Sequence, residues 1–184
     1  MHNIIVIIFC LSMIFISCNS DDHIRTYRLP KNVMQKENSK TNIDTDFKMD
    51  WERPDQWKEV EGHSMRLASF SAPFSGGIGD VSITTFGGAS GGIAPNVNRW
   101  LGQVGLDPRS PAEITEMAIK KVGKLGNYSY FKLINDGDRE SAILASIFLL
   151  EDRTVFVKLS STLMGIKEIE SDFVRFCNSL FERN

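Results

Sequence analysis

Apolar and polar positions divide the chain into three stretches with different patterns. Residues 4–16 are almost continuously apolar, residues 19–46 are mostly polar without a sustained period, and short patterned runs begin at Trp51. The apolar run is shorter than the ~20 residues of a membrane-spanning helix and is typical of a signal peptide. The polar stretch has too little apolar surface to fold. We therefore predict a signal peptide at 1–17, a flexible tether at 18–46 and one domain at 47–184.

Strands are predicted first within the domain. Residues 65–70 and 81–86 alternate with the period of two that half-buried strands show. The intervening segment, Phe74 to Asp80, contains three glycines. Glycines are frequent in turns, so we expect a turn or flexible loop there.

Two helices should follow the glycine-rich segment 87–95. The first should begin near Asn96, because the apolar side chains of residues 97, 100, 101 and 104 fall on one helical face. The second begins at a capping box, with Ser110 as the N-cap, proline at 111 and Glu113 at the third position. Its predicted buried residues are Ile114, Met117, Ala118 and Val122.

Three further strands and a helix complete the domain. The strands read YSYFKLI (128–134), SAILASIFLL (141–150) and TVFVKLS (154–160), with a tight turn at Glu151-Asp152. The middle one is apolar on both faces and should lie inside the sheet. A helix over about 164–181 should bury Cys177 as a small apolar side chain. This order predicts an α+β fold, with an antiparallel β-sheet and helices packed on both faces.

The end of the leader carries a further signal. Phe15-Ile16-Ser17-Cys18 resembles the lipobox of bacterial lipoproteins, in which the cysteine is diacylated and becomes the first residue after cleavage. The resemblance implies a lipid on Cys18 that anchors the chain to a bacterial membrane. We therefore expect a lipoprotein of the cell envelope.

Composition and charge exclude several classes of function. The formal net charge of −2 is spread along the chain, so no basic face is expected and nucleic acid is not an expected partner. The three cysteines are Cys10 in the leader, Cys18 and Cys177, which leaves no disulfide framework for the domain. Apolar packing must stabilise it instead.

Several motifs together point to a family. They are Trp51-x-x-Pro54-x-x-Trp57, Phe86-Gly87-Gly88, Gly91-Gly92, Asn96-Val97-Asn98-Arg99-Trp100 and Gln103-x-Gly105-Leu106. Together they resemble small bacterial lipoproteins of the PsbP-like and DcrB-like α/β/α sandwich group, over most of the chain from Trp51 to Phe181. That resemblance implies a sandwich domain with a non-catalytic role in docking or assembly.

Metal binding and cofactor binding are not expected. His2, His23 and His63 lie in the leader, the tether and the domain, without paired spacing. The run from Asn135 to Asp138 is far shorter than an EF-hand loop, so we interpret it as a turn. We predict no metal ligands and no cofactor.

Catalysis is also not expected, although residues 88–92 (GASGG) match the G-x-S-x-G pattern between a strand and a helix. No histidine follows Ser90, so the hydrolase order of nucleophile, acid and base is not met. Only His63 could serve as a base. We therefore predict no catalytic residues.

The same glycines leave two interpretations open. Backbone N–H groups before a helix can hold a phosphate or carboxylate, with Arg99 supplying charge. Alternatively, the glycines only permit a wide turn with positive φ, and Asn96 caps the helix. We favour the turn.

A polar face on the first helix is the main candidate surface, because Asn96, Arg99 and Gln103 share one side. We expect a non-catalytic module that binds an envelope protein; the alternative is a small-ligand or anion-binding protein, or less readily a hydrolase, using loop 87–95. Trp51 and Trp57 are expected to pack in or beside the core. The predicted binding residues are Arg66, Gly87, Gly88, Gly91, Gly92, Asn96, Asn98, Arg99 and Gln103.

Replacement of Cys18 by serine tests the anchor. Because the thiol is the acylated group, Cys18→Ser should abolish labelling by radioactive fatty acid and shift the chain out of the membrane fraction. Wild-type and variant chains that fractionate identically would contradict the lipoprotein interpretation.

Overall fold

A seven-stranded antiparallel sheet forms the centre of the structure. A computed structural model describes residues 47–62, 65–137 and 140–183, which belong to one compact unit. The predicted leader, Cys18, the tether and His63 lie outside these residues. Hydrogen-bonded neighbours follow the order β2-β3-β4-β8-β7-β6-β5. The strands are β2 (Lys58–Glu59), β3 (Ala68–Phe74), β4 (Gly77–Gly87), β5 (Ile119–Gly123), β6 (Gly126–Asn135), β7 (Ser141–Leu149) and β8 (Arg153–Ser161).

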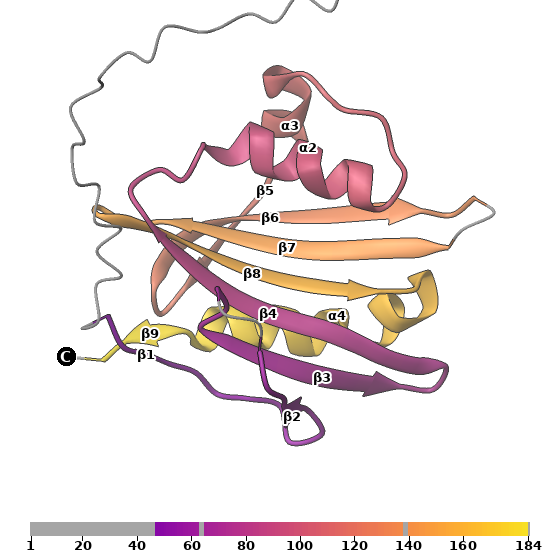
Figure 1. Cartoon of the computed structure of the whole chain (residues 1–184), viewed down its shortest axis with the longest axis horizontal. Helices are drawn as coiled ribbons and strands as arrows, with labels where there is room; N and C mark the ends of the chain where they lie inside the picture. The colour runs from indigo at the N-terminus through magenta and orange to yellow at the C-terminus, as the bar shows by residue number, and fades with distance from the viewer. Residues whose placement is uncertain (1–46, 63–64, 138–139, 184) are drawn as a thin grey trace, which may run out of the picture. The chain divides into compact units, whose positions relative to one another are not determined.

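The pairing of β4 with β8 joins two halves of this sheet. Strands β2 to β4 precede the helices α2 (Ile93–Gln103) and α3 (Pro111–Met117), and β5 to β8 follow them as a meander. The helices cross one face, while α4 (Leu163–Ser179) lies on the other (Figure 1). The predicted α+β fold, an antiparallel sheet with helices on both faces, is confirmed.

The larger core lies between the sheet and α4. Strand alternation points Phe70 and Val81 toward α4, which contributes Phe173 and Phe176 from one face. Trp57 is 1% exposed, and its ring lies 5.1 Å from that of Phe176. Trp51 is partly buried against the same cluster, so the expectation that both tryptophans pack at the core is confirmed.

A second core lies between the sheet and the two short helices. Val97, Trp100 and Leu101 of α2 and Ile114 of α3 pack on residues of β6, β7 and β8. The Trp100 ring meets Phe156 of β8 edge-on at 5.9 Å. The two cores therefore use opposite faces of the same strands, which explains why β7 is buried along nearly its whole length.

The predicted start of α2 is wrong by three residues. The helix begins at Ile93 with Gly92 as its N-cap and no side-chain cap, because Pro95 is tolerated in the first helical turn. Asn96 is therefore not a cap. It lies inside the helix, buried, and its amide donates to the Gly92 carbonyl at 2.7 Å.

Two other predictions are wrong: that Val122 is a buried residue of the second helix, and that residues 74–80 form a loop. Helix α3 ends at Met117, and Val122 lies in β5 with 72% of its surface exposed, so the helical spacing continued into a strand by coincidence. The expected loop from Phe74 to Asp80 is largely strand. Gly79 belongs to β4, where a side chain would approach Leu159 Cδ1 at 2.7 Å, so the glycine is needed for close packing.

Most of the remaining elements match the predictions, although the first strand, expected over 65–70, runs from Ala68 to Phe74. Ser110 and Glu113 form the capping box, and Leu150 donates its N–H to the Arg153 carbonyl across the tight turn. Cys177 is fully buried, and burial raises the pKa of its thiol to about 12, so the thiol stays protonated and unreactive. The closing helix stops at Ser179 rather than at residue 181.

A short ribbon joins the two ends of the described chain. Strand β1 (Met49–Asp50) pairs with β9 (Phe181–Glu182) in antiparallel register, apart from the main sheet. An ion pair between Arg183 and Asp50 reinforces this pairing.

Two glycines offer a matched test of this packing. At Gly165 in α4 a methyl group would collide with Ser161 Oγ and lie 2.8 Å from Phe74 Cε1, so Gly165→Ala should lower the free energy of unfolding by about 1–3 kcal/mol. At Gly102 in α2 no atom lies within 4 Å, so Gly102→Ala should raise it by about 0.5–1 kcal/mol. Urea denaturation measures both, and equal effects would contradict the described contact.

Candidate functional site

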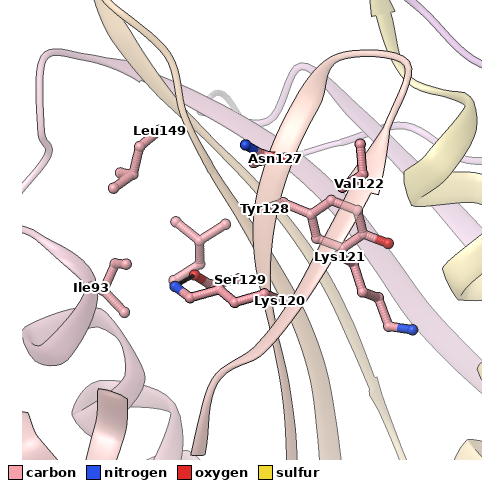
Figure 2. Close-up of a pocket in the computed structure, with 9 residues that line it drawn as sticks. Ile93, Lys120, Lys121, Val122, Asn127, Tyr128, Ser129 and Leu149 are labelled. Carbon is pink, nitrogen blue, oxygen red and sulfur yellow. Dashed lines mark hydrogen bonds between the residues drawn. The ribbon is translucent and has the colours of Figure 1, made fainter. Parts of the chain in front are cut away.

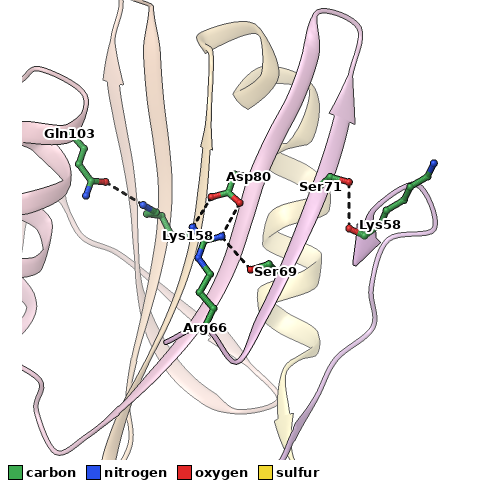
Figure 3. Close-up of polar contacts among 7 residues, drawn as sticks. All are labelled: Lys58, Arg66, Ser69, Ser71, Asp80, Gln103 and Lys158. Carbon is green, nitrogen blue, oxygen red and sulfur yellow. Dashed lines mark hydrogen bonds and ion pairs between the residues drawn. The ribbon is translucent and has the colours of Figure 1, made fainter. Parts of the chain in front are cut away.

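Helices α2 and α3 cover only part of the sheet face on which they pack (Figure 1). Two regions of that face stay open among the described residues. One is an apolar groove beside Ile93, formed by β5, β6 and β7 (Figure 2). The other is polar and crosses β8, β4 and β3 (Figure 3).

The polar region follows from the strand register. One row of paired residues crosses five strands, from β6 to β3. Its members are, in order, Phe131, Ala145, Lys158, Ser82 and Ser69. The next row runs from Leu133 and Ile143 to Ser160, Asp80 and Ser71. Both rows change from apolar to polar at β8, where helical cover ends. We call this surface the polar half-face: Arg66, Ser69, Ser71, Asp80, Ser82, Lys158 and Ser160. Ser69 and Ser82 are themselves buried, so the other five residues carry its accessible groups.

An ion pair of good geometry lies at its centre. Arg66 donates to both carboxylate oxygens of Asp80, at 2.9 and 3.0 Å, and also to Ser69 Oγ at 3.2 Å. This two-pronged contact orients the guanidinium plane. About half of the Asp80 side chain and 22% of the Arg66 side chain remain exposed, so both are accessible.

Lys158 is the residue that connects the sheet to α2. Its ammonium donates to Gln103 Oε1 at 3.2 Å, and Figure 3 shows it beside the Arg66–Asp80 pair. Burial lowers the pKa of Lys158, the Asp80 carboxylate opposes that shift, and Arg66 and Arg99 add to it. Lys158 is thus influenced by one carboxylate and two guanidinium groups, and the formal charges of these four groups, three positive and one negative, sum to +2.

The polar side chains of α2 divide between this site and local structure. Arg99 is exposed and donates to Asn96 Oδ1 at 2.7 Å. Asn98 faces the following loop, where it donates to the Arg109 carbonyl at 2.9 Å and accepts from the Arg109 N–H at 2.8 Å. Asn98 therefore holds the loop between the helices.

The glycine-rich loop lies at the other end of α2. Gly88, Gly91 and Gly92 have φ values of 64°, 77° and 79°, the left-handed region that glycine adopts without strain. Gly88 donates to the Asp152 carbonyl at 2.7 Å and accepts from Thr154 Oγ1 at 2.8 Å, which fastens the loop to the start of β8. These φ values and hydrogen bonds fit the interpretation in which the glycines form a wide turn.

Ser90 in this loop is tied to backbone groups. Its hydroxyl donates to the Gly87 carbonyl at 3.3 Å, and its own carbonyl accepts from the Asn96 amide at 3.0 Å. Its φ of 43° is unusual for a residue other than glycine. The structure shows no general base beside Ser90 among the described residues; His63 lies outside them.

The predicted turn at Asn135 is confirmed for residues 135–137, which the structure describes. Asn135 Oδ1 accepts from the Gly137 N–H at 3.0 Å, and its amide nitrogen donates to the Val104 carbonyl at 2.7 Å. Within residues 47–62, 65–137 and 140–183, no three His, Cys, Asp or Glu side chains converge as a ligand set for a metal. No described helix has the length and apolar composition to span a bilayer.

The structure therefore gathers part of the predicted binding set. Arg66, Arg99 and Gln103 meet around Lys158, whereas residues 87, 88, 91 and 92 form a separate loop and Asn98 is engaged elsewhere. Sequence reasoning missed Lys158 and Asp80. The signal for Lys158 was present, because it is the only charged residue within the apolar strand TVFVKLS.

Comparisons with known proteins leave the family open. No family model and no curated protein matches the sequence. A crystal structure from Bacteroides thetaiotaomicron is 16% identical with a TM-score of 0.47; the alignment covers 74% of this chain and only 45% of that one. LpqN of Mycobacterium tuberculosis, a protein involved in cell envelope biogenesis, is 9% identical with a TM-score of 0.41, over 75% of this chain and 84% of LpqN. Likenesses this distant carry no function to this chain.

Charge balance at the site can be tested by thermal unfolding. At neutral pH the folded state bears a cost for Lys158, since its pKa is lower folded than unfolded. That cost begins to fall as pH rises through the folded pKa and is gone above the unfolded pKa. Lys158→Met should therefore leave the melting temperature unchanged or raise it. Asp80→Asn should lower stability by about 0.5–1 kcal/mol, because it leaves three cations without their carboxylate. Strong destabilisation by Lys158→Met would show that the lysine is needed for the fold.

Proposed function

We propose that this protein is a lipid-anchored, non-catalytic interaction module of the bacterial cell envelope. Its binding surface is the polar half-face together with Arg99 and Gln103 of α2. The observation that carries the proposal is the change of one sheet face from apolar to polar at β8, where a half-buried lysine and two arginines remain around a single carboxylate.

Charge determines the kind of partner. A local charge of +2 on a chain whose overall formal charge is −2 concentrates positive potential at one place. Such a patch attracts and orients an acidic segment. An acidic surface or strand of another envelope protein would neutralise Lys158 and Arg99 without disturbing the Arg66–Asp80 pair.

The chemistry of the site favours binding over catalysis. Its hydroxyl groups are serines on strands, Arg66 is already engaged by Asp80, and Lys158 by an amide oxygen. None of these contacts pairs a nucleophile with a base. The lipid on Cys18 and the tether, as predicted from the sequence, would keep this surface near a membrane.

Site-specific crosslinking in cells tests the proposal. A photoreactive residue at Ser71, on the polar half-face, should capture an envelope partner. Arg99→Glu combined with Lys158→Gln should reduce that capture about tenfold, because an acidic partner loses its attraction to this patch. The crosslinked species is measured by immunoblot and identified by mass spectrometry.

Lys167→Glu provides a control for a charge change elsewhere on the domain. Lys167 is exposed on α4, in the layer on the other side of the sheet, so its charge reversal should leave capture at Ser71 unchanged. Equal capture by the wild type and the charge variant would sink the proposal. So would an equal loss in the Lys167→Glu chain, since the effect would then reflect overall charge.

A further inference from the structure

The apolar groove beside Ile93 is lined in part by large apolar side chains that are exposed to solvent and so contribute little to the core. It has a volume of about 510 Å³, within the ~300–1,000 Å³ typical of small-molecule sites. Val122 of β5 and Leu149 of β7 line it with 72% and 53% of their surfaces exposed, and Ile93 and Ile147 complete the walls. Large apolar side chains that gather at an open concave surface mark a binding site.

The groove is also cationic at one wall. Lys120 and Ser129 are directly paired across β5 and β6, and the ammonium donates to Ser129 Oγ at 2.9 Å. Figure 2 shows Lys120 lying across β6 toward Ile93. None of the nine residues that line the groove is Asp or Glu. The ammonium therefore meets a neutral hydroxyl and retains donors for an anion.

The ammonium of the neighbouring residue, Lys121, points to the other face of the sheet. Its ammonium lies 5.4 Å from the centre of the Tyr130 ring, and Tyr130 belongs to the core on the α4 side. Adjacent strand residues point to opposite faces, so Lys120 and Val122 face the groove while Ile119 and Lys121 face away. Lys121 still borders the groove, so the controls are Ile119, on the other face of β5, and Lys132, whose ammonium pairs with Glu170 of α4.

We propose that this groove binds a long-chain fatty acid. The alkyl chain lies on Ile93, Val122 and Leu149, and the carboxylate accepts from Lys120. A flexible alkyl chain suits these walls better than an aromatic ligand does, because Tyr128, the aromatic residue among those that line the groove, is only 3% exposed and its ring is stacked on Phe148 in the core on the α4 side. This site is separate from the polar half-face and does not depend on a protein partner.

Photolabelling of the full chain in washed membranes tests the proposal. The probe is a palmitic acid analogue with a mid-chain diazirine and a terminal alkyne, added without ATP so that it is not converted to other lipids. Peptide mapping should place adducts on segments containing Val122 or Leu149, apart from any acyl group at Cys18. The corresponding alcohol, which lacks the carboxylate, should label about tenfold less.

Four variants separate the groove from the surface around it. Lys120→Gln and Val122→Glu should each reduce the adducts about tenfold, whereas Lys132→Gln and Ile119→Glu should retain them, because neither Lys132 nor Ile119 lines the groove. Ile119, Lys120, Val122 and Lys132 are all exposed, so folding should persist and is checked by circular dichroism. Equal labelling of all four variants, equal labelling by acid and alcohol, or no adducts in the wild type would each overturn the proposal.

Discussion

The pairing of β4 with β8 is the interaction on which the rest of this structure depends. It aligns eight residue pairs, from Asp80 with Ser160 to Gly87 with Arg153, between segments far apart in the chain. Without it the two halves of the sheet would be separate hairpin layers with exposed edges. With it, both cores and the polar half-face are built on one continuous surface.

A sheet this wide explains the two open regions. Seven strands at about 4.8 Å spacing span roughly 29 Å, whereas two helices of about 10 Å diameter cover roughly 20 Å. On the other face, α4 is assisted by the segment that contains Trp51 and Trp57. On the α2 face no such segment appears among the described residues. One uncovered side became polar, around Lys158, and the other remained apolar, around Val122.

Much of the fold could be predicted because its signals are local. The capping box at Ser110, the strand SAILASIFLL and the spacing of apolar residues in the last helix each identify an element from neighbouring residues alone. The errors arose where contacts between distant residues determine the structure. Gly79 is a strand residue because it pairs with Ala72 of β3, and Val122 is in a strand because it pairs with Asn127 of β6. For the same reason, only part of the candidate site was predicted from the sequence. Arg66 and Gln103 were noticed singly, but only the register brings them to Lys158.

The ribbon of β1 and β9 determines which part of the domain would yield first under tension. A pull transmitted along the chain into Phe47 would reach this two-pair ribbon and the Arg183–Asp50 contact before it reached the main sheet. Peeling two pairs apart takes less work than shearing the eight that join β4 to β8. If the proposed lipid on Cys18 ties the chain to a membrane, motion of that membrane would be absorbed at one short element, and the surfaces on the opposite side of the sheet from α4 would keep their shape under load.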